Sequence, residues 1–271
     1  MSTLAPSPAP SPAARPTGAR IGTPAVGRGV SATYLKLELR RFFRNRRTLI
    51  FSLVMPPAFF LIFGTASDYT TQKAGNGNVT AWILVSMALY GALLTATSGG
   101  ASVSVERAQG WTRQLRLTPL RSWAYVVTKI TATMALGAVS VLITVGVGLA
   151  LGKAHMPFYA WILAPLIAWA GSIVFAAFGL FMGYLLPSEN VMQILGPVLA
   201  LLSFAGGLFF PLGDGWFADV AKVMPTYGLA ELTRAPLGDG FSGWAVVNVV
   251  AWAVVFSLGA AWRFRKDTAR V

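Results

Sequence analysis

The sequence predicts an all-α, polytopic membrane protein with six transmembrane helices. Its 271 residues are 55% hydrophobic and only 11% charged, whereas ordinary soluble domains are about 25% charged. The mean hydropathy is +0.62. Apolar runs close to the ~20 residues needed to cross a hydrocarbon core of ~30 Å occur at 48–66, 79–101, 125–151, 159–186, 191–211 and 243–262.

The segment before these runs, residues 1–30, is rich in Pro, Ala, Ser and Gly. It has too few large apolar side chains to offset the entropy of ordering, so we expect a disordered tail. It also lacks the basic start, apolar core and cleavage site of a secretory signal in that order. We therefore expect this tail to be retained in the cytoplasm.

Residues 31–47 predict an amphipathic helix that lies in the lipid headgroup layer. Leu35 and Leu39 fall at helical spacing, and Lys36, Arg40 and Arg44 occupy the opposite face. An apolar stripe opposite a basic face is typical of an interfacial helix. A soluble helix packed on a partner is the alternative.

The apolar runs carry two further signals. Pro56 and Pro57 predict a kink in the first span, which neighbouring helices can tolerate. Small residues let helix backbones approach closely in a membrane. We expect that role for Gly99, Gly100, Gly179, Gly183, Gly206 and Gly207.

The connections between the runs predict the orientation of the chain. Nine Lys and Arg residues precede the first run, four lie between the second and third, and four follow the last. The intervening connections carry few. Because Lys and Arg accumulate on the cytoplasmic side, we expect both termini and the loop at 106–121 to be cytoplasmic, in the plasma membrane.

Residues 106–118 predict a short amphipathic helix in that loop. Arg113 and Arg116 accompany the apolar Trp111 and Leu115, and Pro119 would end the helix. A stiff helix anchored to two spans can pass a displacement from a soluble partner into the bundle. A solvated turn that simply obeys the positive-inside rule is the alternative.

Two blocks of residues carry a family pattern. The first comprises Glu106, Arg107, Gly110, Thr112, Leu115, Arg116, Thr118, Pro119 and Leu120, followed by Lys129. The second runs from Gly206 to Leu212 and continues with residues 224–227, Glu231 and Arg234. Together they resemble the permease subunits of type-2 ABC transporters, especially the branch of daunorubicin-type drug exporters. The resemblance covers roughly residues 31–267.

This resemblance implies one permease domain with an elbow helix at 31–47, a coupling helix at 106–118, external helices at 212–242 and a cytoplasmic tail at 268–271. It implies a second permease chain, identical or different, and two copies of a separate ATPase that binds ATP and Mg²⁺. The residues that it assigns to contact with the ATPase are Glu106, Arg107, Gly110, Thr112, Arg113, Leu115, Arg116, Thr118 and Pro119.

The sequence offers no catalytic, cofactor or metal site on the chain itself. Cysteine is absent and His155 is the single histidine. Gly152-Lys153-Ala154 lacks the first glycine and the hydroxyl of a phosphate loop. The net charge of +13 lies along membrane borders without a recognition module, so we expect no nucleic-acid partner. We interpret the glycosylation sequon that begins at Asn78 as a chance match.

The spans contain few charges that could serve a transport path. We expect Lys129, near a span end, to extend toward the cytoplasmic interface. The neutral or aromatic candidates for a substrate path are Thr95, Thr97, Ser98, Gln193, Phe204 and Asn248. Candidates for an outer gate are Phe209, Phe210, Pro211, Glu231 and Arg234, the last two of which could form a local ion pair.

We therefore expect the permease subunit of an ATP-driven exporter that moves a hydrophobic or amphipathic compound. Export of a lipid or lipid-linked polymer is the alternative within the same superfamily. An ion-coupled carrier or a membrane scaffold is the alternative from another class. A carrier would place acidic residues in mid-span, whereas the nine acidic residues here fall in predicted tails, loops or membrane edges.

Overall fold

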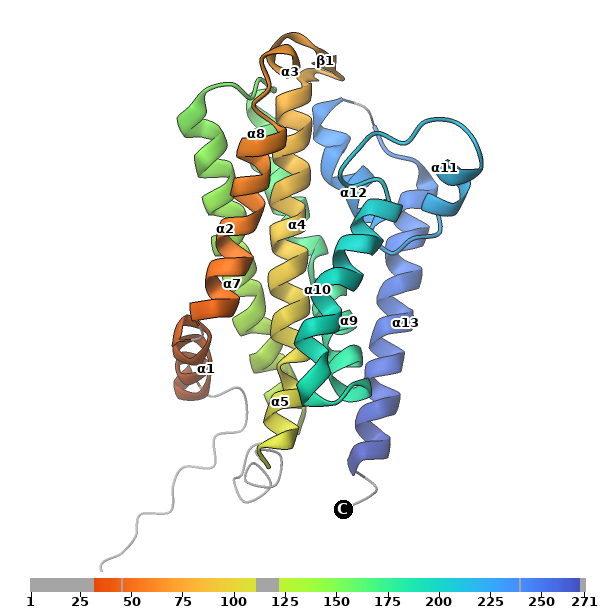
Figure 1. Cartoon of the computed structure of the whole chain (residues 1–271). Helices are drawn as coiled ribbons and strands as arrows, with labels where there is room; N and C mark the ends of the chain where they lie inside the picture. The colour runs from red at the N-terminus through yellow and green to blue at the C-terminus, as the bar shows by residue number, and fades with distance from the viewer. Residues whose placement is uncertain (1–31, 45, 111–121, 239, 269–271) are drawn as a thin grey trace, which may run out of the picture.

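The computed structural model describes residues 32–44, 46–110, 122–238 and 240–268, which form an elongated helical bundle (Figure 1). This architecture confirms the all-α, polytopic prediction. The principal helices are α1 (Ala32–Arg44), α2 (Arg46–Phe63), α4 (Val79–Ala101), α5 (Val103–Ala108), α7 (Ser122–Leu151), α8 (Phe158–Gly171), α9 (Ile173–Leu185), α10 (Ser188–Ala205) and α13 (Gly243–Thr268). The predicted tail at 1–30, and all but the first residue of the predicted tail at 268–271, lie outside the described residues.

Within the described part of the chain, four helical runs are long and apolar enough to cross a membrane. They are Val79–Ala108, Ala124–Leu151, Phe158–Leu185 and Gly243–Lys266. The other two predicted spans correspond to shorter apolar helices, Ile50–Phe63 and Gln193–Ala205. The predicted span at 191–211 was too long, because α10 ends at Ala205 and Gly207 then turns with φ +70°.

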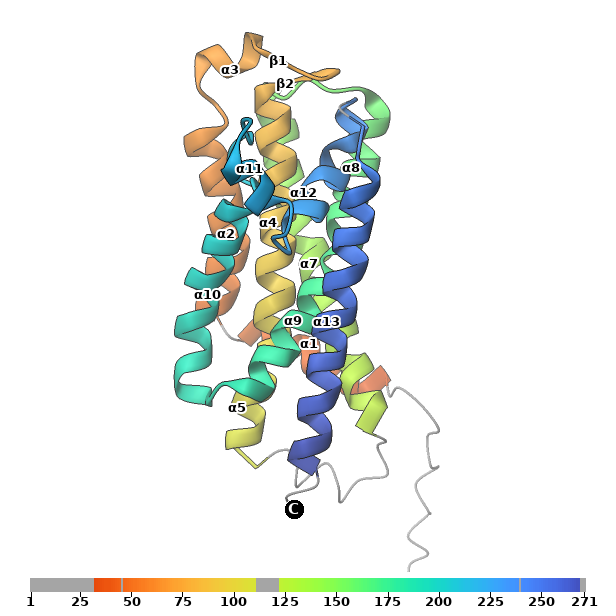
Figure 2. The ribbon, with the colours of Figure 1, turned by 90° about the vertical axis from the view of Figure 1, so that its right-hand side faces the viewer.

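Helix α4 is the centre of the bundle. It packs against α2, α7, α8, α9, α10 and α12, and 83% of its most apolar stretch is buried, against 17% for α13. Figure 2 shows α4 enclosed by the other helices while α13 runs along one side. Most of the apolar surface of α13 therefore remains available to lipid or to another chain.

Glycines allow α4 and α9 to touch backbone to backbone. A Cβ built on Gly179 would stand 2.2 Å from the carbonyl oxygen of Thr97, and one on Gly100 would stand 2.4 Å from that of Ala176. A Cβ on Gly183 would stand 3.0 Å from the Cα of Ala101. The predicted close approach of small residues is confirmed at these three glycines.

Helix α2 runs through Pro56 and Pro57 without interruption. Pro56 packs on α4, where a Cβ on Gly91 would meet its Cγ at 3.0 Å. Ser140 of α7 donates a hydrogen bond to the carbonyl of Ser52 at 3.2 Å. Contacts from two neighbouring helices thus support the segment whose internal bonding the prolines weaken.

One end of the bundle carries α3 (Ser67–Thr71) and a small antiparallel hairpin of β1 (Lys73–Ala74) and β2 (Gly77–Asn78), in which Lys73 pairs with Asn78. We call this the hairpin end. Figure 1 places α1, α5 and the last turn of α13 at the opposite end, which we call the α5 end.

Asn78 joins the connections at the hairpin end. Its Oδ1 accepts hydrogen bonds from the amides of Ala81 at 2.9 Å and His155 at 3.0 Å. Its Nδ2 donates to the carbonyls of Thr70 at 3.1 Å and Lys153 at 2.8 Å. Asn78 therefore caps the amino terminus of α4 and ties two separate connections together.

After α10 the chain folds back into the bundle through α11 (Trp216–Ala221), α12 (Tyr227–Arg234) and the 3₁₀-helix η1 (Ala235–Leu237). Helix α12 contacts α4, α8 and α13. Figures 1 and 2 both place α11 and α12 in the half of the bundle next to the hairpin. We call residues 206–238 the fold-back segment.

Candidate functional site

Helices α1, α5 and α7 meet at a buried group of charged side chains near the α5 end. Lys129 of α7 places Nζ 2.7 Å from Oε1 of Glu38 on α1. The same Nζ contacts Oε1 of Glu106 on α5, and Arg41 Nη1 lies 2.7 Å from that oxygen. The Tyr125 hydroxyl donates to the other oxygen of Glu106. We call these five residues the ion cluster.

The ion cluster is stable only as a unit. The side chains of Lys129 and Glu106 are 1% exposed and that of Glu38 is 5% exposed. An unpaired buried charge costs several kcal/mol, but here two carboxylates face two cations and their oxygens accept further hydrogen bonds. The pairing therefore fixes α1, α5 and α7 relative to one another.

The ion cluster corrects two predictions. Lys129 does not extend toward an aqueous interface, because two carboxylates hold it inside the bundle. Glu106 was expected on a water-facing loop helix, and instead it lies in the first turn of α5 with its side chain buried. The nine acidic residues were expected to lie in tails, loops or membrane edges. In the sequence, Glu38 and Glu106 lie outside the predicted spans, as expected. In the structure, however, both side chains are buried.

Helix α5 continues α4 after a break at Ser102 and leads directly into the predicted coupling segment. Arg107 donates to the carbonyls of Tyr184 at 3.2 Å and Gly183 at 3.4 Å, at the carboxyl end of α9. Gly110 has φ +71° with no atom within 4 Å of its Cβ position. Within the described chain, Gly110 allows a left-handed backbone turn, and no neighbouring segment packs closely against it.

The rest of the predicted coupling helix lies outside the described residues. These positions are Thr112, Arg113, Leu115, Arg116, Thr118 and Pro119. Glu106 and Arg107 thus lie at the root of the predicted coupling segment (residues 111–118), and they are held by helices α7 and α9 respectively.

At the hairpin end, Arg234 holds the fold-back segment in place. Its guanidinium donates to the carbonyls of Leu208 at 2.7 Å and Gly207 at 3.0 Å, and to Ser86 Oγ at 2.8 Å. It also lies 3.7 Å from the ring centroid of Trp82. The turn after α10 exposes carbonyls that lack helical partners, and Arg234 satisfies two of them.

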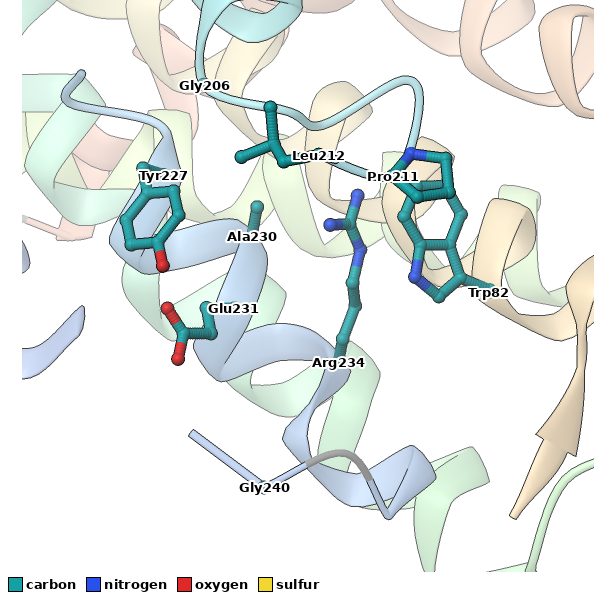
Figure 3. Close-up of a pocket in the computed structure, with 9 residues that line it drawn as sticks. All are labelled: Trp82, Gly206, Pro211, Leu212, Tyr227, Ala230, Glu231, Arg234 and Gly240. Atoms are coloured by element: carbon teal, nitrogen blue, oxygen red, sulfur yellow. The ribbon is translucent and has the colours of Figure 1, made fainter. Parts of the chain in front are cut away.

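The predicted ion pair between Glu231 and Arg234 is wrong. Figure 3 shows the guanidinium directed at the loop that carries Pro211, with Glu231 pointing the other way toward Tyr227. Oε1 of Glu231 instead accepts a hydrogen bond from the amide of Ser242 at 2.6 Å. Helical spacing placed the two side chains on neighbouring positions but could not reveal these distant partners.

The predicted gate aromatics form two separate contacts. Phe209 packs edge-on against Tyr90 of α4, with ring centroids 5.0 Å apart. Phe210 lies between Phe204 of α10, at 4.7 Å, and Phe217 of α11, at 6.1 Å. The structure therefore brings Phe204, predicted for the substrate path, to the gate candidates.

Three side chains of helix α13, spaced four residues apart, donate hydrogen bonds to the turn between α11 and α12. Trp244 Nε1 donates to the Lys222 carbonyl and Trp252 Nε1 to the Val223 carbonyl, both at 2.9 Å. Asn248 Nδ2 donates to Lys222 at 2.9 Å and to Met224 at 3.1 Å. The three donors lie on one face of α13, and this spacing was the signal that sequence reasoning missed.

Asn248 was predicted for the substrate path. In the structure its side chain hydrogen-bonds the fold-back segment. Thr95 likewise hydrogen-bonds the carbonyls of Gly91 and Ala92 in its own helix. Gln193 is exposed on α10. The other two candidates, Thr97 and Ser98, lie on α4 among its packed neighbours.

Replacing Asn248 with alanine should loosen the turn at 222–228. The change removes two donated hydrogen bonds and the acceptor of the Gly228 amide, and each buried group left unsatisfied costs about 1–3 kcal/mol. Hydrogen exchange of amides 222–228 should rise by at least tenfold. Asn190→Ala, at an exposed position on α10, should leave exchange there unchanged. Equal protection in both variants would contradict the role of Asn248.

Comparison with known proteins assigns the chain to a family. A family model described as "ABC-2 type transporter" matches residues 32–237. The chain belongs to the ABC-2 type transporter family. The stretch that matches this ABC-2 model begins with α1 and ends with η1, so it contains both the ion cluster and the fold-back segment up to Leu237.

A protein of Bacillus subtilis (strain 168) named "Putative transport permease YvfS" is 24% identical over 241 residues, which cover 86% of this chain and 96% of that protein. The present chain is thus similar to a transport permease over nearly the whole length of that relative. Membership of the ABC-2 family makes the chain a multi-pass transport permease and implies an ATPase partner and dimerisation in general.

Proposed function

We propose that the chain is the membrane subunit of an ATP-driven exporter that moves a hydrophobic or amphipathic compound out of the cell by alternating access. ATP and Mg²⁺ bind to two copies of a separate ATPase subunit, and a second permease chain, identical or related, completes the path. The ABC-2 family match supports the transporter, and the ion cluster at the root of the coupling segment supports the mechanism.

The α5 end faces the cytoplasm of the cell in this proposal. It gathers the basic helix α1, the root of the coupling segment and the last turn of α13, which carries Arg265 and Lys266 (Figure 1). Lys and Arg accumulate on the cytoplasmic side of membrane proteins. The same end is where a cytoplasmic ATPase would dock.

The ion cluster suggests how movement of the ATPase enters the bundle. The coupling segment, residues 111–118 beyond Gly110, contacts the ATPase, and α5 carries its displacement to Glu106. Because Glu106 contacts Arg41 on α1 and Lys129 on α7, three helices shift together. Packed elements linked in this way switch between discrete arrangements instead of absorbing the motion.

The opposite end then opens for release. Phe209 and Phe210 lie on the turn that Arg234 holds, so a shift of α12 against α4 would move both aromatic contacts together. The apolar surroundings of this turn favour an apolar or amphipathic cargo over a small ion.

Two single substitutions, one in the ion cluster and one in the coupling segment, should give different defects. Glu106→Gln should leave the ATPase bound but abolish stimulation of ATP hydrolysis by cargo, because Glu106 is buried inside the permease. Arg116→Ala should weaken capture of the ATPase itself. Both are measured on the complex purified from its native membrane, by pull-down and by ATP hydrolysis with and without cargo.

Glu189→Gln is the matched control, since Glu189 is an exposed carboxylate at the start of α10. It should behave as the unmodified chain in both assays. A chain that purifies without any ATPase after crosslinking would argue against the proposed function. Normal coupling in Glu106→Gln would instead overturn only the role of the ion cluster.

A further inference from the structure

Helix α1 presents three cations that have no partner within the described chain. Lys36, Arg40 and Arg44 follow one another at four-residue spacing, so they lie on one side of the helix, and all three are exposed. None of them forms an ion pair or a hydrogen bond with another described residue. We call these three residues the cationic face. The single carboxylate of α1, Glu38, is buried on the other side of the helix.

That other side of α1 is fixed to the bundle by the ion cluster. Glu38 contacts Lys129 of α7, and Arg41 contacts Glu106 of α5. Figure 1 places α1 at the edge of the bundle, next to the end of α2. Because these ion pairs hold the inner side of α1, its cationic face points away from the other helices.

The cationic face lies close to the hydrocarbon boundary of the membrane. The apolar part of α2 begins at Ile50, only a few residues beyond Arg44. Leu37, which is 57% exposed, lies on α1 one turn before Arg40 and two turns before Arg44. An exposed leucine beside unpaired cations matches a ligand that carries both negative charge and hydrocarbon.

The cations of this face favour a phosphate. Guanidinium groups bind phosphate oxygens through two parallel charge-assisted hydrogen bonds. Each Lys or Arg near an anionic lipid surface strengthens attachment about fivefold. A zwitterionic lipid also has a phosphate, but its own ammonium group cancels the attraction for further cations. The face should therefore distinguish anionic from zwitterionic headgroups.

We propose that the cationic face of α1 binds the phosphate groups of anionic phospholipids in the leaflet at the α5 end, with Leu37 against their acyl chains. The bound lipid holds α1 against α7, because Glu38 and Arg41 on the same helix contact Lys129 and Glu106. The occupant is a lipid and not an acidic protein surface, since the cations adjoin an exposed leucine and an apolar helix. The proposal requires only that the chain spans a membrane.

Lipid binding is tested on the purified full-length chain in a nonionic detergent, without ATP or the ATPase. The probes are phosphatidylglycerol and phosphatidylcholine with identical acyl chains, and native mass spectrometry measures the affinity for each. The unmodified chain should bind phosphatidylglycerol at least about tenfold more tightly. Equal affinities would overturn the proposal and leave the face for another partner, such as the ATPase. Equal competition by soluble glycerol 3-phosphate would overturn the assignment to a lipid.

The triple variant Lys36→Gln, Arg40→Gln, Arg44→Gln removes the cationic face. Its three side chains are exposed and make no contact that the fold needs. The preference for phosphatidylglycerol should fall to about twofold or less, because most of the electrostatic attraction is lost. A preference that stays at the level of the unmodified chain would place the anionic lipid elsewhere.

The matched control is Lys73→Gln, Lys153→Gln, Lys222→Gln. It removes the same number of charges from exposed lysines in the hairpin, in the connection before α8 and in the fold-back segment. This variant should keep the preference of the unmodified chain. An equal loss in the two triple variants would show that net charge, and not the position of the cations on α1, determines lipid binding.

The effect of the lipid on α1 is measured separately in nanodiscs. Hydrogen exchange of the α1 amides should be at least about fivefold slower in equal parts of phosphatidylglycerol and phosphatidylcholine than in phosphatidylcholine alone. The difference should disappear when the cationic face is removed. Identical exchange of α1 in the two membranes would overturn the claim that the lipid holds this helix. Because no measurement uses cargo or the ATPase, failure here leaves the proposed function untouched.

Discussion

Replacing Lys129 with methionine should destabilise the protein by about 3–5 kcal/mol, the usual cost of removing one partner from a buried ion pair. The change leaves the carboxylate of Glu38 without its ammonium partner, inside a site where it is 5% exposed. Of the described residues, Glu106 would retain the Tyr125 hydroxyl and one cation, Arg41, whose side chain is 44% exposed. Thermal or denaturant unfolding of the chain in nanodiscs measures the loss.

The control is Lys222→Met, which removes an exposed lysine that lies 2.9 Å from Asp219. Exposed pairs contribute about 0–1 kcal/mol, so this variant should unfold almost as the unmodified chain does. If Lys129→Met were equally mild, the ion cluster would not be a buried unit.

A triple variant separates stability from coupling. Combining Lys129→Met with Glu38→Gln and Glu106→Gln removes the buried charges together, and apolar or neutral replacements of a complete ion pair are often neutral for stability. We expect the triple variant to recover most of the lost stability without recovering cargo-stimulated ATP hydrolysis. Recovery of both would show that the cluster only stabilises the bundle.

Replacing Gly179 with alanine should have the second large effect. The new Cβ would stand 2.2 Å from the backbone oxygen of Thr97 and 2.9 Å from its Cα, so α4 and α9 would have to separate. Overpacking of this kind typically costs 1–3 kcal/mol and occasionally more. The yield of folded chain in detergent and its unfolding temperature should both fall.

Gly146→Ala is the matched control on another apolar helix. No atom of the described chain lies within 4 Å of its Cβ position, and alanine is favoured over glycine within a helix by roughly 0.5–1 kcal/mol. This variant should be as stable as the unmodified chain or slightly more so. Similar losses in both variants would mean that the contact of α4 with α9 does not explain the effect.

Hydropathy was sufficient to locate the helices along the sequence. It did not predict the residues at which they end or how deeply each is buried in the bundle. The predicted run at 79–101 coincides with α4, because a long uninterrupted apolar stretch has one stable solution in lipid. The run at 159–186 is broken at Ser172 into α8 and α9, and α10 ends at Ala205. Such local breaks depend on tertiary hydrogen bonds that hydropathy does not contain.

Features of the candidate site that depend on residues close together in the sequence could be predicted. Features that depend on contacts between distant residues could not. Small-residue spacing identified Gly179 and Gly183 from local pattern alone. The contact of Lys129 with Glu38 joins residues 91 positions apart, and that of Arg234 with Ser86 joins residues 148 positions apart. With a single sequence, nothing indicates which distant carboxylate or carbonyl such a cation will meet.

The capping role of Asn78 determines how its glycosylation sequon could be removed for expression in eukaryotic cells. The usual Asn78→Gln change would discard the cap of α4 and the links to the Thr70 and Lys153 carbonyls. Thr80, the third residue of the sequon, is buried and its hydroxyl has no hydrogen-bond partner among the described residues. Thr80→Val would therefore abolish the sequon at no structural cost, since valine replaces an unsatisfied hydroxyl with a methyl group of similar shape.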